Sequence, residues 1–350
     1  MTKLNINRQA MAGMIFTAFF VGGCGGTDTP VAEDTDGDTT VDGDTDGGSD
    51  TTVSSLDIAE FSEGALASSN LVDCELSDGT AAQCYELVTV GAAKSSDLIG
   101  PFCPRTTTST SDEGGVWLDG EALYEANGDF ILNLPNIYGQ AYPPADNWIL
   151  YDENGDVRVT DTLAGCVAAA RPDVDPEYQS YCVECALEDL EIDLSMTFLI
   201  PATPVVADSP GALTPGVGIS LNGFQIAAQA PVSDILSNYT IAAFDDCGGH
   251  VNPNDGYHYH SATAADGCNS AGTDADGHPA LIGYAMDGYG IYGPLDEGSA
   301  EIDLLDGCYG QEDEVRGYHY HAASAEKNEH IACFHGKTTS AGDDRPPRPE

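Results

Sequence analysis

Positive charge is scarce in this sequence of 350 residues. It contains 11 Lys and Arg against 58 Asp and Glu, which gives a formal net charge of −47 at pH 7. Proteins that bind nucleic acid draw much of their affinity from clustered Lys and Arg, and the few cations here are scattered along the chain. The composition therefore argues against a nucleic-acid partner and predicts a surface that attracts cations.

Long hydrophobic runs and common catalytic motifs are also missing. The one markedly apolar run, residues 10–21, is shorter than the roughly 20 residues that span a bilayer, which excludes a polytopic membrane protein. No Gly-x-Ser-x-Gly, His-Glu-x-x-His or Walker A motif occurs, and no Gly-x-Gly-x-x-Gly precedes an expected helix. A serine hydrolase, a zincin protease and a nucleotide enzyme are therefore unsupported.

The short apolar run is typical of an export signal. It follows two basic residues and ends in Val-Gly-Gly-Cys24, which resembles a bacterial lipoprotein signal cleaved before the cysteine. We expect residues 1–23 to be removed and Cys24 to be lipidated. Gly25 lacks the acidic side chain that favours inner-membrane retention, so we expect an exported protein anchored to the outer membrane or cell surface. Ordinary secretion is the alternative.

The 11 cysteines fit an exported protein. Without Cys24 their number is even, which predicts a disulfide framework formed in an oxidising compartment and leaves no obvious free thiol for catalysis. Cys74 and Cys84 flank a turn and are expected to staple a hairpin. Cys182 and Cys185 form an isolated Cys-x-x-Cys that lacks the second pair of a four-thiolate zinc site, so we interpret it as structural.

Composition divides the rest of the chain into four parts. Residues 24–65 are rich in Gly, Thr, Ser and acids and are predicted to form an acidic disordered tether. The tether carries a partial calcium-loop pattern that lacks the glutamate at position twelve, so calcium is a candidate cation there. Residues 66–200 are predicted to form a β-rich N-terminal domain, residues 201–340 a second domain, and residues 341–350 a disordered tail.

Short runs of Val, Ile, Tyr and Leu alternate with turns rich in Gly, Pro, Asn and Asp. This pattern predicts a mainly β fold, sandwich-like in its two parts and stapled by disulfides, with few short helices. The expected strands include residues 129–134, 148–151 and 194–200, the expected helix covers residues 162–170, and the expected hairpin turns are Asn154-Gly155, Asn222-Gly223 and Asp287-Gly288.

All eight histidines lie between residues 250 and 335. Two copies of Gly-Tyr-His-Tyr-His occur, with His258 of the first matching His319 of the second at an offset of 61 residues, and the match continues upstream through Asp, Cys and Gly positions. The C-terminal part is therefore an internal duplication. Each copy is followed by a further cysteine, and the disulfides expected from this repeat are Cys247–Cys268 and Cys308–Cys333.

The histidine pattern suits a metal site. Successive side chains on a strand point to opposite faces, so the histidines of each motif share one face and the tyrosines share the other. If the two copies pair as neighbouring strands, four imidazoles form one compact site for a divalent transition metal, copper slightly ahead of zinc because the ligands are imidazole-rich. These four candidate metal ligands are His258, His260, His319 and His321.

Other residues are candidates to complete this site. His250 and His278 in loops and His335 after a cysteine are candidate further ligands or contacts to a ligand. The second copy has Gln311 where the first has His250. We expect His330 to be exposed in a loop. Candidates to orient an imidazole or act as a general base are Asp246 and Asp287, the latter more simply a turn residue.

These motifs carry a resemblance. Residues 216–336 resemble the bacterial YHYH-domain protein family. The motifs on which the resemblance rests are Cys-Gly-Gly-His250, both Gly-Tyr-His-Tyr-His copies, the run that begins at Leu281, and Ile291-Tyr-Gly-Pro. The resemblance implies an exported, β-rich YHYH domain within residues 201–340. It implies no particular reaction, substrate or cofactor.

Three functions fit these observations. The first is an extracytoplasmic, lipid-anchored protein that binds a transition metal. The second is a metalloenzyme at the same histidines, hydrolytic with zinc or oxidative with copper. The third is a surface module without metal, in which the imidazoles hydrogen-bond to tyrosine hydroxyls and backbone carbonyls and exposed tyrosines bind glycans or proteins. The sequence leaves catalysis and protein partners open.

Overall fold

The structure is a computed structural model that describes residues 55–90, 100–169, 171, 174–185, 195–253 and 255–340. These residues form mainly β structure with a few short helices, which confirms the expected fold class. The described residues all belong to one compact unit. Strand β7 (Thr197–Pro201) runs across the position where the sequence predicted a domain boundary. The expected signal, Cys24, the calcium pattern and the tail lie outside the described residues.

The folded part begins earlier than the sequence predicted. Residues 55–65 were assigned to the disordered tether, but Leu56 is buried and the ring of Phe61 stacks on that of Tyr284 with centroids 5.9 Å apart. These two apolar side chains anchor the start of the fold because burial removes their surface from water. Residues 55–65 therefore belong to the folded part of the chain.

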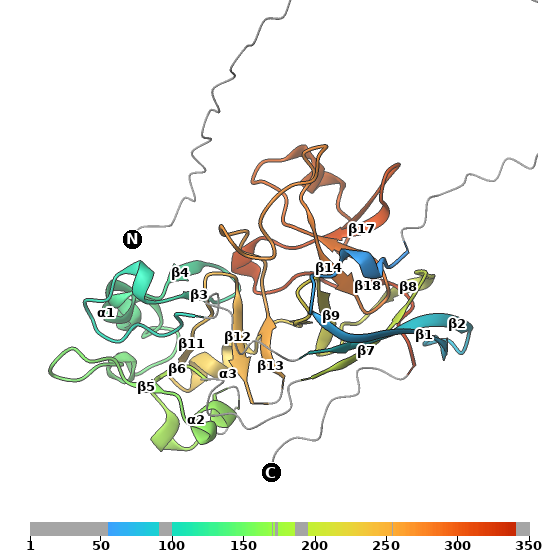
Figure 1. The fold of residues 1–350 in the computed structure, drawn as a ribbon. Helices are drawn as coiled ribbons and strands as arrows, with labels where there is room; N and C mark the ends of the chain where they lie inside the picture. The colour runs from blue at the N-terminus through green and yellow to red at the C-terminus, as the bar shows by residue number, and fades with distance from the viewer. Residues whose placement is uncertain are drawn as a thin grey trace, which may run out of the picture. The chain divides into compact units, whose positions relative to one another are not determined.

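The largest sheet contains eight strands in the order β12-β13-β10-β9-β14-β15-β17-β16. Figure 1 labels β12, β13, β9, β14 and β17 of this sheet. In its first half, the antiparallel hairpin β9–β10 is followed by β13, which pairs parallel with β10, and by β12, antiparallel to β13. The second half repeats these pairings with β14, β15, β17 and β16. The halves meet where β9 and β14 pair antiparallel. The sequence duplication is therefore a duplication of a four-stranded unit.

The strands of this sheet are short, and their bounds follow the sequence motifs. The two hairpin turns lie at Asn222-Gly223 and Asp287-Gly288, as predicted, where Gly223 and Gly288 have φ of 87° and 90°, values that glycine adopts without strain. The strands are β9 (Gly216–Ser220), β10 (Gln225–Ala227), β12 (Gly249–Asn252), β13 (Gly256–Tyr259), β14 (Leu281–Ala285), β15 (Gly290–Tyr292), β16 (Gly310–Asp313) and β17 (Gly317–His321).

Smaller sheets surround this one. The longest strands, β1 and β2, form a hairpin that extends to β7. The other described strands form the sets β11-β6-β5, β18-β8 and β3-β4. Their bounds are β1 (Leu66–Glu75), β2 (Ala81–Thr89), β3 (Val116–Leu118), β4 (Leu123–Glu125), β5 (Val159–Thr160), β6 (Cys182–Val183), β8 (Val206–Gly211), β11 (Ile241–Ala242) and β18 (Phe334–Gly336).

The helices are short, and one replaces an expected strand. Residues 129–134 lie in α1 (Gly128–Ile137), where the Asn127 side chain caps the first turn and Phe130, Ile131 and Leu134 are buried at helical spacing. A short apolar run does not distinguish a strand from a helix, so the strand prediction was wrong. The remaining helices are α2 (Leu163–Ala168), α3 (Val232–Ser237), η1 (Ile58–Glu60), η2 (Ser111–Glu113), η3 (Ala145–Trp148), η4 (Pro176–Tyr178), η6 (Ala300–Leu304) and η7 (Ala325–Lys327).

Two further local predictions have different outcomes. Residues 148–151 are not a strand: Trp148 ends η3, and Tyr151 makes only an isolated bridge to Val157 around the turn at Asn154-Gly155. The helix predicted at 162–170 is α2, whose first turn is capped by the Thr162 side chain.

Five disulfides join described cysteines. They include the three pairs expected from the sequence, and Cys182 and Cys185 each bond to a distant cysteine, so neither thiol is free to bind zinc as a Cys-x-x-Cys pair. The five are Cys74–Cys84, Cys103–Cys182, Cys166–Cys185, Cys247–Cys268 and Cys308–Cys333.

Candidate metal centres

The two Tyr-His-Tyr-His strands are not neighbours, because β10, β9, β14 and β15 separate β13 from β17. The single four-histidine site predicted from the sequence is therefore wrong. The structure forms two groups of three histidines instead, and in each group one ligand atom per residue lies within 4.8 Å of the others. The first centre is His250, His258 and His260; the second centre is His278, His319 and His321.

The first centre is built on two paired strands. His250 of β12 lies opposite His258 of β13 in the antiparallel register, so their side chains share a face, and His260 follows two residues later on that face. The ring centroids of His250 lie 4.7 and 5.0 Å from those of His258 and His260. The Nε2 atoms of His258 and His260 are 3.0 Å apart.

Hydrogen bonds from Nδ1 to backbone carbonyls orient these rings. Nδ1 of His258 lies 3.0 Å from the Gly256 carbonyl, and Nδ1 of His260 lies 2.6 Å from the Ala228 carbonyl. A carbonyl only accepts, so each Nδ1 carries the proton. Burial lowers the pKa of His260 well below its usual value, which disfavours a second proton. In this tautomer the Nε2 atoms of His258 and His260 point their lone pairs toward a common position.

The second centre repeats this arrangement with a different third histidine. Nδ1 of His319 and His321 lies 2.9 and 3.1 Å from the carbonyls of Gly317 and Gly293, the counterparts of those in the first centre. His278 comes from the segment between β13 and β14, its Nδ1 is 2.8 Å from the Pro279 carbonyl, and its Nε2 is 3.2 Å from that of His319. Burial lowers the pKa of His319, and that of His321 to about 4.

These distances fit a transition metal. Metal–imidazole bonds of about 2.0–2.1 Å in a tetrahedral arrangement hold the ligating nitrogens about 3.3 Å apart, and the closest Nε2 pairs here are 3.0 and 3.2 Å apart. Zinc- and copper-bound histidines donate their other ring N–H to a carbonyl or carboxylate, which orients the ring. Backbone carbonyls meet that condition for five of the histidines: His258, His260, His278, His319 and His321. The residues present therefore fit a bound metal ion in each centre.

The tyrosines of each motif lie on the face of the sheet opposite the histidines. The hydroxyl of Tyr257 donates to Asp245 at 2.7 Å, and that of Tyr318 donates to Asp306 at 2.9 Å, so the two copies hold their first tyrosine in the same way. Burial is the main cause that raises the pKa of Asp245 to about 6. The first tyrosine of each motif thus bonds to a carboxylate. The described hydrogen bonds of the motifs join no tyrosine hydroxyl to an imidazole, so that part of the expected imidazole–tyrosine ladder is absent, whereas its bonds from imidazoles to backbone carbonyls are present.

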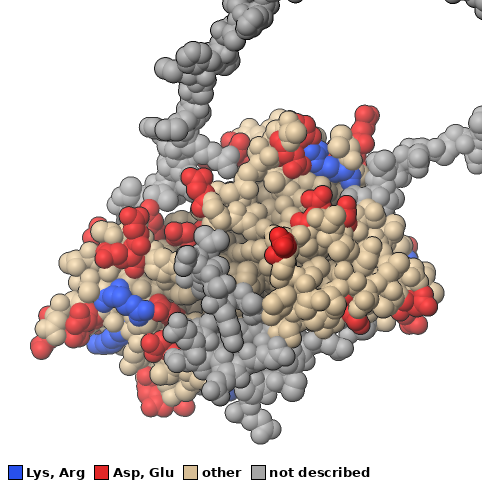
Figure 2. Space-filling view, in the orientation of Figure 1, with Lys and Arg blue, Asp and Glu red and all other residues tan. Residues whose placement is uncertain are grey.

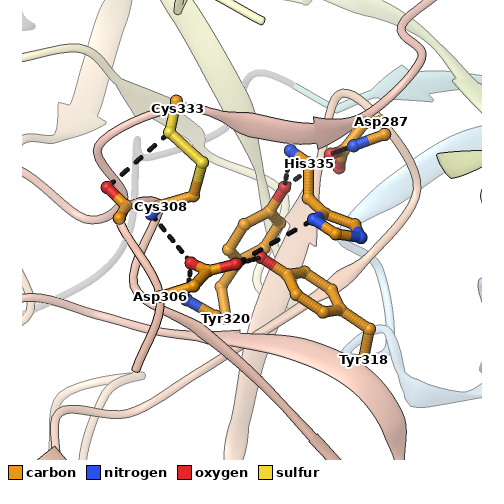
Figure 3. The surroundings of a disulfide bond; sticks show 10 residues. Asp287, Asp306, Cys308, Tyr318, Tyr320, Cys333 and His335 are labelled. Atoms are coloured by element: carbon orange, nitrogen blue, oxygen red, sulfur yellow. Dashed lines mark hydrogen bonds and ion pairs between the residues drawn. A yellow bond between two sulfur atoms is a disulfide. The ribbon is translucent and has the colours of Figure 1, made fainter. Parts of the chain in front are cut away.

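Two other predicted residues lie outside both centres. The ring of His335 stacks on Tyr318 with centroids 3.7 Å apart, and its Nδ1 lies 3.9 Å from the Asp306 carboxylate (Figure 3). His335 therefore belongs to the tyrosine face. His330 is 3% exposed, so the expectation of an exposed loop residue was wrong. The segment after β17 folds back onto the first copy, where the Gln229 amide donates to the Lys327 carbonyl.

The two acidic candidates do not contact an imidazole of either centre in the described hydrogen bonds. Asp287 is buried at its turn and accepts from the hydroxyl of Tyr320 and the backbone N–H of Gly336 (Figure 3). Asp246 is exposed, and its backbone carbonyl accepts from the Thr263 hydroxyl. Asp287 is thus more than a turn residue, because its carboxylate holds the second tyrosine of the second motif.

Gln311 is a residue whose role the sequence reasoning missed. It lies opposite His319 in the β16–β17 register, as His250 lies opposite His258, and its Nε2 is 3.0 Å from Nε2 of His321. Its position in the repeat was visible in the sequence. Its place beside the second centre was not, because that centre takes its third histidine from another segment.

The surface and the helices add two observations. Figure 2 shows acidic side chains in several groups across the face drawn, with fewer Lys and Arg, in keeping with the charge balance of the sequence. None of the helices in the described part of the chain is long and apolar enough to cross a bilayer.

The fold and these centres define a disulfide-linked, β-rich domain made of two four-stranded units, each with three histidines in an arrangement compatible with metal binding. The family model described as YHYH protein matches residues 197–312, so the chain carries a YHYH domain. The match begins with β7 and ends within β16, before the second Tyr-His-Tyr-His motif. No curated protein and no solved structure matches this chain.

Proposed function

We propose that this protein is an exported, lipid-anchored metal-binding protein whose two centres each hold one transition-metal ion. One observation carries the proposal: in each centre two Nε2 atoms face each other, at 3.0 Å and 3.2 Å, while the Nδ1 atoms of the same rings bond to carbonyls. With the proton on each Nδ1, the two Nε2 atoms have only lone pairs to point toward a common position. A cation between them satisfies both.

Copper is the preferred ion and zinc the second. All the ligand candidates in the two groups are imidazoles, which suit both metals, and the general order of divalent affinities places Cu(II) above Zn(II) for a nitrogen site. The ligands must be unprotonated to bind, and burial already holds the pKa of His260 and His321 below the usual value. The centres are therefore ready to bind a metal at neutral pH.

Export and anchoring rest on the N-terminal sequence together with the disulfides. The run of residues 10–21 before Cys24 supports a lipoprotein signal, and the five disulfides favour an oxidising compartment. Replacing Cys24 with Ala in an exporting bacterial host is expected to move the protein from the membrane fraction to the soluble fraction. A protein that fractionates identically with and without Cys24 would contradict the anchor.

The metal proposal is tested by elemental analysis of the tag-free mature protein from an exporting host. We expect two ions per wild-type chain, one in His258→Ala, one in His319→Ala and none in the double variant. His335→Ala is the matched control, because His335 is a half-buried histidine of the same domain that lies on the tyrosine face, and it is expected to keep both ions. Equal metal content in all five proteins would overturn the proposal.

A further inference from the structure

The two centres differ at the position opposite the first histidine of each motif. In the second centre this position holds Gln311, whose Nε2 lies 3.0 Å from Nε2 of His321 and 3.5 Å from Nε2 of His319. A carboxamide presents either its nitrogen or its oxygen when its terminal group rotates. The side chain of Gln311 therefore fills the space beside the second centre, and its oxygen can face an ion bound there.

Other groups enclose the second centre further. The ring of Tyr292 packs against those of His278 and His319, with both centroid distances 5.0 Å. The guanidinium of Arg316 lies 5.7 Å above the Tyr292 ring and is paired with Asp276 and Asp313. These contacts place the Tyr292 ring against two histidines of the second centre, with Arg316 held over it by ion pairs.

The first centre opens onto a cavity instead. Here His250 occupies the position that Gln311 has in the second copy, so three imidazoles are assembled without a carboxamide from that position. All three histidines line a cavity of about 220 Å³. This volume equals that of roughly seven water molecules at about 30 Å³ each, which is room for a small organic molecule.

The walls of this cavity are mostly apolar. They include Phe102, Val183, Pro215 and Ile235. Two carboxylates also line the cavity: Glu184 is paired with Arg105, and Asp255 accepts from the Asn252 amide at 2.9 Å. Asn252 also lines the cavity, and its Nδ2 lies 3.4 Å from Nε2 of His258. A divalent ion held by three neutral imidazoles keeps its full charge in a site of low polarity, where an anionic donor stabilises it.

From this difference, and resting on the proposed metal binding, we infer that the first centre takes an external ligand on its metal while the second is closed by Gln311. The ligand class is a small molecule with one anionic donor atom, such as a carboxylate, and a compact apolar body. The donor binds the ion, and the apolar body lies against the cavity wall. The second centre then has a structural role.

The experiment uses the mature protein loaded with Co(II), whose visible absorption reports its coordination, and azide as the probe. We expect two cobalt ions per chain, of which azide changes the spectrum of one. The response is expected to persist in His319→Ala and to disappear in His258→Ala. Gln311→Ala keeps all six histidines and opens the second centre, so two azide-responsive ions are expected. This gain of response does not depend on how either histidine variant folds.

A second measurement tests the apolar wall. Acetate, propionate and butyrate are titrated against the first centre in the His319→Ala protein, and affinity is expected to rise about fourfold for each methylene buried. No rise along the series would overturn the ligand class. Two responsive ions in the wild type, or none, would overturn the difference between the centres while leaving metal binding intact. A protein that takes up no cobalt would instead overturn the proposed function.

Discussion

Replacing Tyr320 with Phe removes a single hydroxyl from the second motif and tests why the motif contains tyrosine. This hydroxyl donates to the buried carboxylate of Asp287 at 2.5 Å and accepts from the backbone N–H of His335 at 2.6 Å (Figure 3). Asp287 is fully buried, and burial raises its pKa. The hydroxyl thus supports a carboxylate that cannot reach water.

The duplication supplies a matched control. Tyr259 is the equivalent residue of the first motif, and its hydroxyl accepts from the neutral side-chain amide of Asn222 at 2.8 Å. A hydrogen bond to a charged group contributes about 1.5–3 kcal/mol, and a neutral one about 1 kcal/mol. Tyr320→Phe loses one of each kind and is expected to lower the free energy of unfolding by about 3 kcal/mol. Tyr259→Phe is expected to lower it by about 1 kcal/mol.

The assay is urea unfolding at pH 7 with the disulfides intact and a chelator present, so that lost metal does not contribute to the difference. The change in free energy is taken from the shift of the midpoint at constant slope. If Tyr259→Phe destabilises the protein as much as Tyr320→Phe, the assignment of a buried, tyrosine-supported carboxylate at Asp287 is refuted.

Three further predictions follow from the same structure. Removing bound metal is expected to lower the melting temperature by about 5–10 °C per centre, relative to protein at a free metal concentration of about 100 times Kd. In calorimetry, His258→Ala is expected to halve this decrease. An unchanged melting temperature would argue against bound ions. Burial raises the pKa of Asp245 to about 6 from about 3.9 in the unfolded chain, so its protonation stabilises the fold below pH 4 and this stabilisation is lost as pH rises through 6. Relative to Asp245→Asn, the wild type is therefore expected to gain about 2 kcal/mol from pH 7 to pH 4 in urea titrations, and parallel pH profiles would contradict this. A Cβ on Gly249 would lie 2.3 Å from the Tyr257 hydroxyl, so Gly249→Ala is expected to destabilise the protein by about 1–3 kcal/mol. Gly307 also lacks a positive φ and has open space around it, so Gly307→Ala is the control and is expected to change stability little.

Local patterns in the sequence were sufficient for much of the fold. The turns at Asn222-Gly223 and Asp287-Gly288 predicted hairpins, since glycine there adopts a positive φ. The Cys74–Cys84 pair flanks its hairpin turn. The prediction failed at residues 129–134, because a run of six residues with apolar members fits both periodicities, and only packing against Trp148 and its neighbours favours the helix.

The sequence by itself determined the kind of centre. The duplicated Tyr-His-Tyr-His motif puts imidazoles on one face of a strand and phenols on the other, because side chains alternate along a strand. Which histidines meet was decided by the tertiary structure alone. Strand order is a long-range property, so no local signal showed that β13 and β17 lie apart. No local signal showed that the segment after β13 brings His278 to His319 and His321 of the second copy. The cavity beside the first centre depends likewise on residues from 102 to 260 that only the folded chain brings together.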